Sequence, residues 1–338
     1  MPLSSPHRLP LLFVYLSFCL IALLSCGKAA HKEQPVVAEQ FSADSAYRFI
    51  AEQVAFGSRV PGSMAHEECC RYLQQTLQRF GAEVEQQTGT MTNYAGEDQT
   101  VVNIIGRFNP SAKRRVLLCA HWDCRPWADQ EDEYSARMTP VSGANDGASG
   151  VGVLLEVARQ LSNKRASGEK TEGIDIVFFD VEDKGTPDFY TGKQREDTWC
   201  LGSQMWALQY KQARKSNPSA PKYRYGILLD MVASPDAVFP REYFSDRYAS
   251  SHLDRVWETA ANLGYGRFFV STASYPVTDD HYYVNTIAGV PCIDIIHYDV
   301  RSNTGFPYYW HTTHDDMTNV STTTLDAVGK TVLTALLH

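Results

Sequence analysis

The chain has 338 residues, with 31 lysines and arginines against 39 aspartates and glutamates, which gives a formal net charge of −8 at pH 7. A chain of this length buries a substantial core, and its 43% hydrophobic and 21% charged residues are typical of a folded globular protein. This composition argues against a disordered, collagen-like or multi-span membrane protein. The acidic balance also argues against a nucleic-acid partner, which requires a basic surface.

The N-terminal segment differs from the rest of the chain. Residues 9–24 are almost wholly apolar, and the four residues that end at Cys26 resemble a bacterial lipobox, where cleavage leaves a cysteine for acylation. We expect a lipoprotein signal peptide over residues 1–25, followed by a lipidated Cys26 and a tether over residues 26–42. An ordinary secretory signal or a membrane anchor is the alternative. In each case the chain is exported. The lipoprotein hypothesis adds that the protein faces the periplasm and touches a bacterial membrane only through its lipid.

The remaining residues, 43–338, alternate between two hydrophobic patterns. Residues 45–54 and 65–80 carry apolar side chains at helical spacing, and Gly81 ends the second helix. Beyond them, continuously apolar runs predict strands covered on both faces, with further helical patterns between them. The expected strands are Thr100–Phe108, Val116–Ala120, Ile174–Phe179, Gly226–Leu229 and Cys292–Ile296, and the expected helices are Gly147–Leu161, Ser203–Arg214, Ser251–Leu263 and Thr322–Leu337.

This alternation predicts a single α/β domain over residues 43–338. We expect three layers, α/β/α, with a mixed, mostly parallel central sheet between the helices. No internal repeat or low-complexity linker divides the sequence. Six cysteines follow Cys26; they show no CxxC zinc pattern, and their spacing leaves any disulfide pairing open.

Acidic residues and histidines follow nearly every predicted strand. In sheets of this kind, active residues lie in the loops after the carboxyl ends of the strands. The sequence therefore predicts one polar site at that edge of the sheet. The residues concerned are His121 and Asp123, then Asp180, Glu182 and Asp183, then Asp230, and finally His297 and Asp299.

Three segments combine residue types that bind metals. Asp146 precedes a predicted helix, Glu182 and Asp183 are adjacent after a buried strand, and His311 lies in a segment rich in histidine and aspartate. Taken singly, each has a structural explanation: Asn145 or Asp146 as a helix cap, the acid pair as a surface loop, and the histidine as a structural residue. Together, two carboxylates and one histidine make a tetrahedral zinc site with one open position, typical of catalytic zinc. The charges of Asp146 and Asp183 balance Zn²⁺, which keeps its ability to polarise a carbonyl.

The order of these motifs resembles that in two groups of enzymes with one shared fold, the zinc-dependent aminopeptidases and the glutaminyl cyclases. The similarity begins near Phe56 and continues to the C-terminus. It rests on His121-Trp122-Asp123, Asn145 to Gly150, Phe178 to Asp183, Asp230 and His311. Three stretches favour the cyclases: Leu228 to Val232, Asp279-Asp280-His281 before Gly289-Val290-Pro291, and Phe306 to His311. The chain therefore resembles bacterial members of the zinc-dependent glutaminyl-peptide cyclotransferases, of the type also found in animals.

The resemblance implies an activity and a set of site residues. Cyclases of this type convert the N-terminal glutamine of peptides and proteins to pyroglutamate with release of ammonia, and they hold one zinc ion per chain. We therefore expect as partners peptides or exported proteins with an N-terminal glutamine, no nucleic acid, and a monomeric protein. The resemblance assigns the metal to Asp146, Asp183 and His311, proton transfer to Glu182, an acidic network to Asp230 and Asp279, and the pocket walls to Trp199, Phe306 and Trp310.

Two positions depart from the animal enzymes. Asp183 stands where they have a glutamate, so the backbone or the metal distance must compensate for one missing methylene. Asp294 stands where they have a histidine in the acidic network, which exchanges a potential cation for a potential anion. Proton transfer at neutral pH further predicts a raised pKa for Glu182 through burial beside Asp230 and Asp279. The loops over residues 125–139 and 184–198 are expected to rim the pocket.

Two other functions are consistent with parts of the pattern. In a two-zinc aminopeptidase, His121, Asp123 and Asp230 would complete a second metal site, with Asp146 bridging the two ions. Alternatively, a lipid-anchored binding protein that has lost catalysis would keep the fold but carry a broken ligand set. The ligand set expected here is complete.

Overall fold

The computed structural model describes residues 37–169 and 171–338. The predicted signal peptide, Cys26 and most of the predicted tether lie outside this part of the chain. Within it, no helix combines the length and apolar character needed to cross a membrane. Residues 39–42, which the sequence analysis assigned to the tether, pack against the folded domain. Phe41 belongs to the hydrophobic core, and the Glu39 backbone N–H donates to Thr334 Oγ1 at 3.1 Å.

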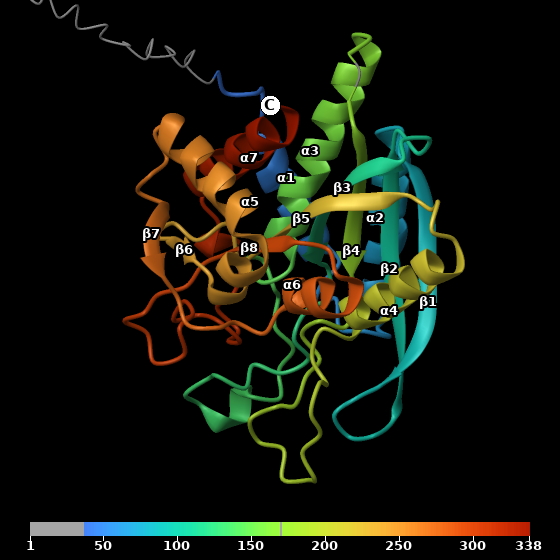
Figure 1. The fold of residues 1–338 in the computed structure, drawn as a ribbon. Helices are drawn as coiled ribbons and strands as arrows, with labels where there is room; N and C mark the ends of the chain where they lie inside the picture. Colours follow the sequence, from blue (N-terminus) through green and yellow to red (C-terminus); the bar gives the residue numbers. More distant parts are fainter. Residues whose placement is uncertain (1–36, 170) are drawn as a thin grey trace, which may run out of the picture. The chain divides into compact units, whose positions relative to one another are not determined.

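A six-stranded sheet forms the centre of the described domain (Figure 1). Its strand order is β1-β2-β4-β3-β5-β8; β1 and β2 pair antiparallel, β2 pairs antiparallel with β4, and the other pairs are parallel. The predicted mixed, mostly parallel sheet is thus confirmed. The strands are β1 Glu83–Thr92, β2 Asp98–Phe108, β3 Arg114–His121, β4 Gly173–Phe179, β5 Lys222–Asp230 and β8 Cys292–Ile296.

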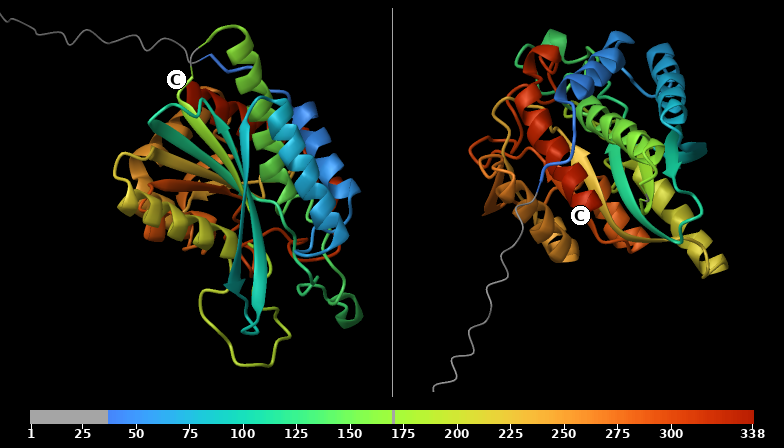
Figure 2. Two further views of the ribbon diagram at one scale, coloured as in Figure 1. Left: turned by 90° about the vertical axis from the view of Figure 1, so that its right-hand side faces the viewer. Right: turned by 90° about the horizontal axis from the view of Figure 1, so that it is seen from above.

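Helices cover both faces of this sheet, as the views in Figure 2 show. The larger core lies on the face covered by α1 Ala43–Ala55, α2 Met64–Arg79, α3 Ala148–Ala166, α5 Tyr243–Asn262 and α7 Thr322–Leu337. The opposite face carries α4 Leu201–Ser216, the short α6 Asp280–Tyr283 and the π-helical turn η2 Val284–Ala288. The remaining elements are the 3₁₀ turns η1 Tyr134–Ala136 and η3 Met317–Asn319, and a two-stranded sheet of β6 Phe239–Arg241 and β7 Phe269–Ala273.

The differences from the predicted elements have local causes. β1 was missed because most of its residues are polar; it forms as an edge strand through its ladder with β2, from Glu83 opposite Arg107 to Thr92 opposite Asp98. α5 begins eight residues before the predicted helix, and the backbone leaves helical geometry inside it at Ala249, which obscures the helical period there.

The topology brings several loops to one edge of the sheet. Since β3, β4, β5 and β8 are parallel, their carboxyl ends meet. The connection from β3 to β4 runs through α3 on one face, whereas the connection from β4 to β5 runs through α4 on the other. In open α/β sheets, ligands bind at such a reversal of the winding. All six cysteines in the described residues are buried and free, so none of them forms a disulfide.

Candidate active site

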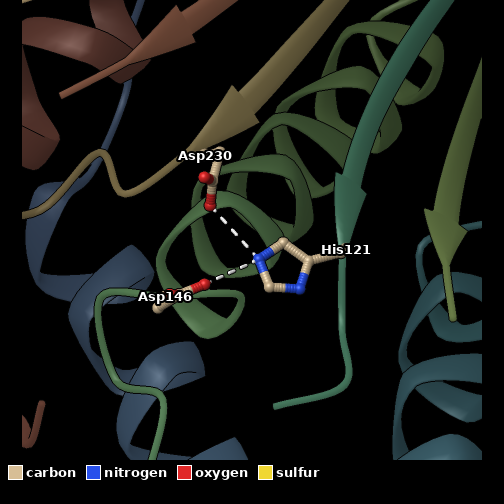
Figure 3. Close-up of side chains that lie close together, drawn as sticks. All are labelled: His121, Asp146 and Asp230. Atoms are coloured by element: carbon tan, nitrogen blue, oxygen red, sulfur yellow. Dashed lines mark hydrogen bonds and ion pairs between the residues drawn. The ribbon is translucent and has the colours of Figure 1, made fainter. Parts of the chain in front are cut away.

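The strand ends supply most of the polar side chains of the site. His121 is the last residue of β3 and Asp230 the last residue of β5, while Glu182 and Asp183 follow β4 within four residues. Asp146 lies in the turn that leads into α3. Figure 3 shows His121 pointing from its strand toward the carboxylates of Asp146 and Asp230. These side chains share the predicted edge of the sheet, whereas Asp180 pairs with His66 at 2.7 Å, and His297 and Asp299 do not line the cavity described below.

One group of three side chains has the donor set of a catalytic zinc site. Ligand atoms of Asp146, Asp183 and His311 all lie within 4.8 Å of one another. His311 Nε2 is 3.0 Å from Asp183 Oδ1 and 3.6 Å from Asp146 Oδ2. Both Asp183 carboxylate oxygens are buried without a hydrogen-bond partner. Buried oxygens of this kind require a compensating charge or donor, so the three residues fit a divalent cation.

His311 has the protonation state that a metal ligand needs. Burial, reinforced by the nearby Arg125 cation, lowers the pKa of His311 to about 3, so its imidazole is neutral at physiological pH. Its other nitrogen, Nδ1, lies 3.7 Å from Asp129 Oδ1. A carboxylate behind a histidine ligand fixes the orientation of the ring and is a common support for zinc sites.

A second group of three shares Asp146 but differs in its hydrogen bonding. His121 Nε2 lies 3.0 Å from Asp146 Oδ1 and 3.2 Å from Asp230 Oδ1 (Figure 3). Asp230 Oδ1 forms a hydrogen bond with His121 Nε2, whereas neither oxygen of Asp183 forms one. Asp123, which the aminopeptidase alternative placed in this group, has another role. Its two oxygens accept the backbone N–H groups of Glu182 at 3.0 Å and Asp183 at 3.2 Å.

The turn before α3 places Asp146 by backbone contacts. The helix-cap interpretation of Asn145 and Asp146 is wrong, because the N-cap residue is Gly147 and no side chain caps the helix. Gly147 has φ of +90°, and a Cβ there would lie 2.7 Å from Asp123 O. Only glycine tolerates both conditions. The Asp146 N–H donates to Asp315 Oδ2 at 3.0 Å, which fixes the turn from the C-terminal side.

Glu182 lies beside the candidate metal ligands in a different environment. Its neighbour Val181 has φ of +53°, so the chain turns sharply after β4 and the two adjacent acids point in different directions. The Cys200 thiol donates to Glu182 Oε1 at 3.1 Å. Burial raises the pKa of Glu182 well above its usual range; the His121 charge opposes this rise and the Asp279 carboxylate adds to it. The direction agrees with the predicted proton carrier, although Asp279 rather than Asp230 is the main acidic contributor.

The acidic network continues on the far side of the cavity. Burial, opposed by the His121 hydrogen bond, raises the pKa of Asp230 to about 7. Asp279 lies close to Glu182, since their carboxylate oxygens and Cys200 Sγ are all within 4.8 Å of one another. Carboxylates gathered so closely can share protons near neutral pH, which suits a site that moves a proton.

All nine predicted site residues line one cavity of about 340 Å³. Its aromatic walls surround the candidate metal ligands. The ring of Trp310 stacks on His311 with centroids 3.6 Å apart, and the rings of Phe306 and Trp310 lie 4.7 Å apart. Trp199 lies parallel to His311 at 6.2 Å. The roles assigned to the nine residues stay predictions. The cavity is also lined by Met231, Pro276, Val277, Thr278, Ile296, Tyr298 and Thr304, which the sequence analysis did not assign.

Two further residues that the sequence analysis placed only in a rim loop support the site from behind. Arg125 and Asp129 form a buried ion pair, with Arg125 Nε donating to Asp129 Oδ1 at 2.8 Å. Arg125 also donates to the Asp183 carbonyl at 3.0 Å and lies over the Trp199 ring at 4.6 Å. The expectation for the two loops needs correction, because no residue of 125–139 or 184–198 lines the cavity.

Asp294 is fully buried, and its carboxyl oxygens have no hydrogen-bond partner although a histidine lies nearby. Burial and the adjacent Asp279 and Glu242 charges raise the pKa of Asp294 well above its usual range, so a neutral carboxyl is favoured. His281 Nδ1 lies 3.5 Å from Asp294 Oδ2, and His281 Nε2 lies 2.9 Å from Glu242 Oε2. Asp294 itself does not line the cavity.

The fold and the candidate site agree with the family found by comparison with known proteins. Residues 103–336, more than half of the chain, match the model of peptidase family M28, and the chain belongs to this family. It is similar over its folded part to the glutaminyl cyclase of Bacteroides thetaiotaomicron bound to N-acetylhistamine, with 44% identity and a TM-score of 0.82 over 89% of this chain and 99% of that one. The resemblance predicted from the motifs is confirmed.

Two other relatives are a zinc exopeptidase and an animal cyclase. A Zn-dependent exopeptidase from Parabacteroides distasonis is 48% identical, with a TM-score of 0.82 over 89% of this chain and 100% of that chain. The glutaminyl-peptide cyclotransferase of Bos taurus is 24% identical over 290 residues, which span 80% of this chain and 76% of the relative. The fold predicted from sequence is therefore shared with zinc exopeptidases and with cyclases.

Proposed function

We propose that the chain is a glutaminyl-peptide cyclotransferase that uses one zinc ion. The observation that carries this proposal is the asymmetry between the two groups around Asp146. Both Asp183 oxygens are buried without a hydrogen bond, although Oδ1 lies 3.0 Å from His311 Nε2, whereas Asp230 Oδ1 is hydrogen-bonded to His121 Nε2 at 3.2 Å. One metal position is therefore favoured over two. The similarity to solved bacterial glutaminyl cyclases and to a Zn-dependent exopeptidase supports both the reaction and the metal.

Asp146, Asp183 and His311 would hold the zinc ion, which when bound supplies a positive charge that polarises the side-chain amide of the substrate. The protein itself prepares these ligands. Asp123 fixes the backbone of Asp183, and Asp129 stands behind the His311 ring. We propose that this fixed backbone position compensates for the shorter aspartate side chain at position 183.

The reaction needs no external nucleophile. The α-amine nitrogen of an N-terminal glutamine attacks its own side-chain amide carbon, a five-membered lactam forms, and the bond from that carbon to the amide nitrogen breaks. Glu182 accepts the proton that the α-amine loses and returns it to the departing nitrogen, which leaves as ammonia. The cavity contributes by holding amine and amide carbon close together, which removes most of the entropic cost of ring closure.

The composition of the cavity matches this substrate. Its walls at Trp199, Phe306 and Trp310 are aromatic, while Asp230 and Asp279 supply carboxylates. The aromatic walls suit the methylene groups of a glutamine side chain, and the acids attract its α-amine. A volume of about 340 Å³ lies at the lower end of ligand pockets, which fits one residue at a chain end better than the middle of a peptide.

Substitution of Glu182 tests the proton transfer. Glu182→Gln should lower kcat/KM for a Gln-peptide by about 10²- to 10⁴-fold, because a carboxamide cannot accept the proton. Bound zinc should stay at the parent level, since Glu182 is not a ligand. Glu196→Gln, an exposed carboxylate on the neighbouring loop, is the matched control and should retain parent activity. A pH profile of Glu182→Gln that follows the parent's would sink the assignment.

The second candidate is a two-zinc aminopeptidase. It is favoured by the second group, in which ligand atoms of His121, Asp146 and Asp230 lie within 4.8 Å of one another, and by the exopeptidase among the structural relatives. It predicts two zinc ions per chain and the release of free amino acids.

We also propose that the protein is an exported lipoprotein, anchored through Cys26 and acting on exported peptides or proteins with an N-terminal glutamine. The apolar run over residues 9–24 and the lipobox-like sequence before Cys26 support this localisation. Cys26→Ser should move the protein from the membrane fraction to the soluble fraction; an unchanged membrane fraction would contradict the lipid anchor.

A further inference from the structure

One wall of the cavity is held from outside by a residue with no contact to the metal ligands. Pro276, Val277, Thr278 and Asp279 line the cavity as one continuous stretch before α6. Glu242, which is fully buried, bonds to one residue within this stretch and to one residue after it. Its Oε1 accepts the Val277 backbone N–H at 3.1 Å, and its Oε2 lies 2.9 Å from His281 Nε2.

The two bonds bracket Asp279. Val277 precedes it by two residues and His281, in the first turn of α6, follows it by two. Asp279 caps this short helix by accepting the Asp280 N–H. A four-residue helix has little stability of its own, so its position depends on outside contacts. Glu242 provides such contacts on both flanks of the residue that approaches Glu182.

The choice of glutamate at position 242 points to this role rather than to helix capping alone. Glu242 is the N-cap residue of α5, where Oε2 accepts the Ser245 N–H at 2.6 Å. Aspartate and serine are the preferred residues at an N-cap, and a buried carboxylate is costly unless it is fully paired. The extra methylene of glutamate allows one carboxylate to cap α5 and also reach Val277 and His281.

Resting on the proposed cyclase function, we propose that Glu242 is a positioning residue that fixes the wall carrying Asp279 against Glu182. The wall then keeps the Asp279 carboxylate close to Glu182. The aromatic side chains on the other walls hold the glutamine side chain. Loss of the Glu242 contacts should therefore affect the proton-transfer step more than substrate binding.

Glu242→Asp separates this role from capping. Aspartate keeps the negative charge and can still accept the Ser245 N–H, but it is one methylene too short to hold Val277 and His281 together. Asp246→Asn is the matched control, since Asp246 lies on the outer side of α5 and pairs with Arg241. Glu242→Gln, which keeps the length and loses the charge, is the second variant and should change the same readouts in the same direction.

Hydrogen–deuterium exchange measures the wall without any turnover. Amides of residues 277–281 should exchange faster in Glu242→Asp than in the parent, and at the parent rate in Asp246→Asn. Parent-like exchange in both Glu242 variants would overturn the positioning role. The exchange measurement tests the positioning role even if the parent protein releases no ammonia. Absence of ammonia release would count against the proposed cyclase function instead.

Steady-state kinetics test whether displacement of the wall slows the reaction. With a Gln-peptide, kcat of Glu242→Asp should fall on the order of 10- to 100-fold, the effect of a displaced catalytic group. KM should rise by a smaller factor than kcat falls, because the displaced Asp279 weakens attraction of the α-amine while the aromatic contacts to the glutamine side chain are retained. An equal loss of kcat in Asp246→Asn, or a change confined to KM, would contradict the proposal.

Discussion

Replacement of Arg125 by methionine should destabilise the folded protein by about 3–5 kcal/mol, the usual loss when one partner of a buried ion pair is removed. The side chains of Arg125 and Asp129 expose only 1% and 0% of their surface, so water cannot replace the lost partner. The variant leaves Asp129 as a buried, uncompensated carboxylate. It also removes the donor to the Asp183 carbonyl and the cation over Trp199.

The assay is urea unfolding of the chelator-treated protein, so that zinc binding does not contribute to the measured stability. Arg107→Met is the control, because Arg107 pairs with Glu85 at the surface and such pairs contribute less than about 1 kcal/mol. The double variant Arg125→Met with Asp129→Asn should recover part of the loss, since no buried charge is left unpaired. Equal unfolding midpoints for Arg125→Met and Arg107→Met would refute the reasoning.

Three further predictions concern the metal, the pocket and the acid limit of stability. Asp183→Asn should lose bound zinc after dialysis, measured as metal content per chain; one retained zinc ion would contradict the ligand assignment. Trp199→Ala should raise KM for Gln-peptides while kcat changes little, and a loss confined to kcat would contradict its place in the binding wall. Burial raises the pKa of Glu242, but the hydrogen bond from His281 outweighs this effect. The pKa is therefore lowered from 4.5 to about 2. Its contribution, of about 3 kcal/mol at most, is present above pH 4.5 and lost as the pH falls toward 2. Glu242→Gln should therefore flatten the acid limb of Tm against pH, and parallel limbs in both proteins would disprove this.

The positions of the carboxylates in the candidate metal site were predictable because each lies next to a strong local signal. Asp183 follows a continuously apolar strand, and Asp146 precedes a helix with a clear apolar stripe. The carboxyl ends of parallel strands must meet, so the sequence alone indicated that these side chains share one edge of the sheet.

The supporting residues were not predictable in the same way. Spacing places Asp123 near the site but does not tell whether its carboxylate faces a metal or the backbone of Glu182. Arg125 lies in a loop whose composition is typical of solvent-exposed loops, and its burial depends on Trp199 and Asp183, both distant in sequence. Glu242 lies 39 residues from His281, and only the packing of α5 against the sheet brings them together.

The central claim is that the cavity closes N-terminal glutamine into a lactam rather than hydrolysing a peptide bond. The most direct measurement incubates the protein with a Gln-peptide and, separately, with leucine amide, and records lactam, ammonia and free leucine with and without a chelator. The account predicts lactam and ammonia in equal amounts from the Gln-peptide, no free leucine from the amide, and loss of activity with the chelator at one zinc ion per chain. Release of free leucine by a protein with two zinc ions per chain would contradict it.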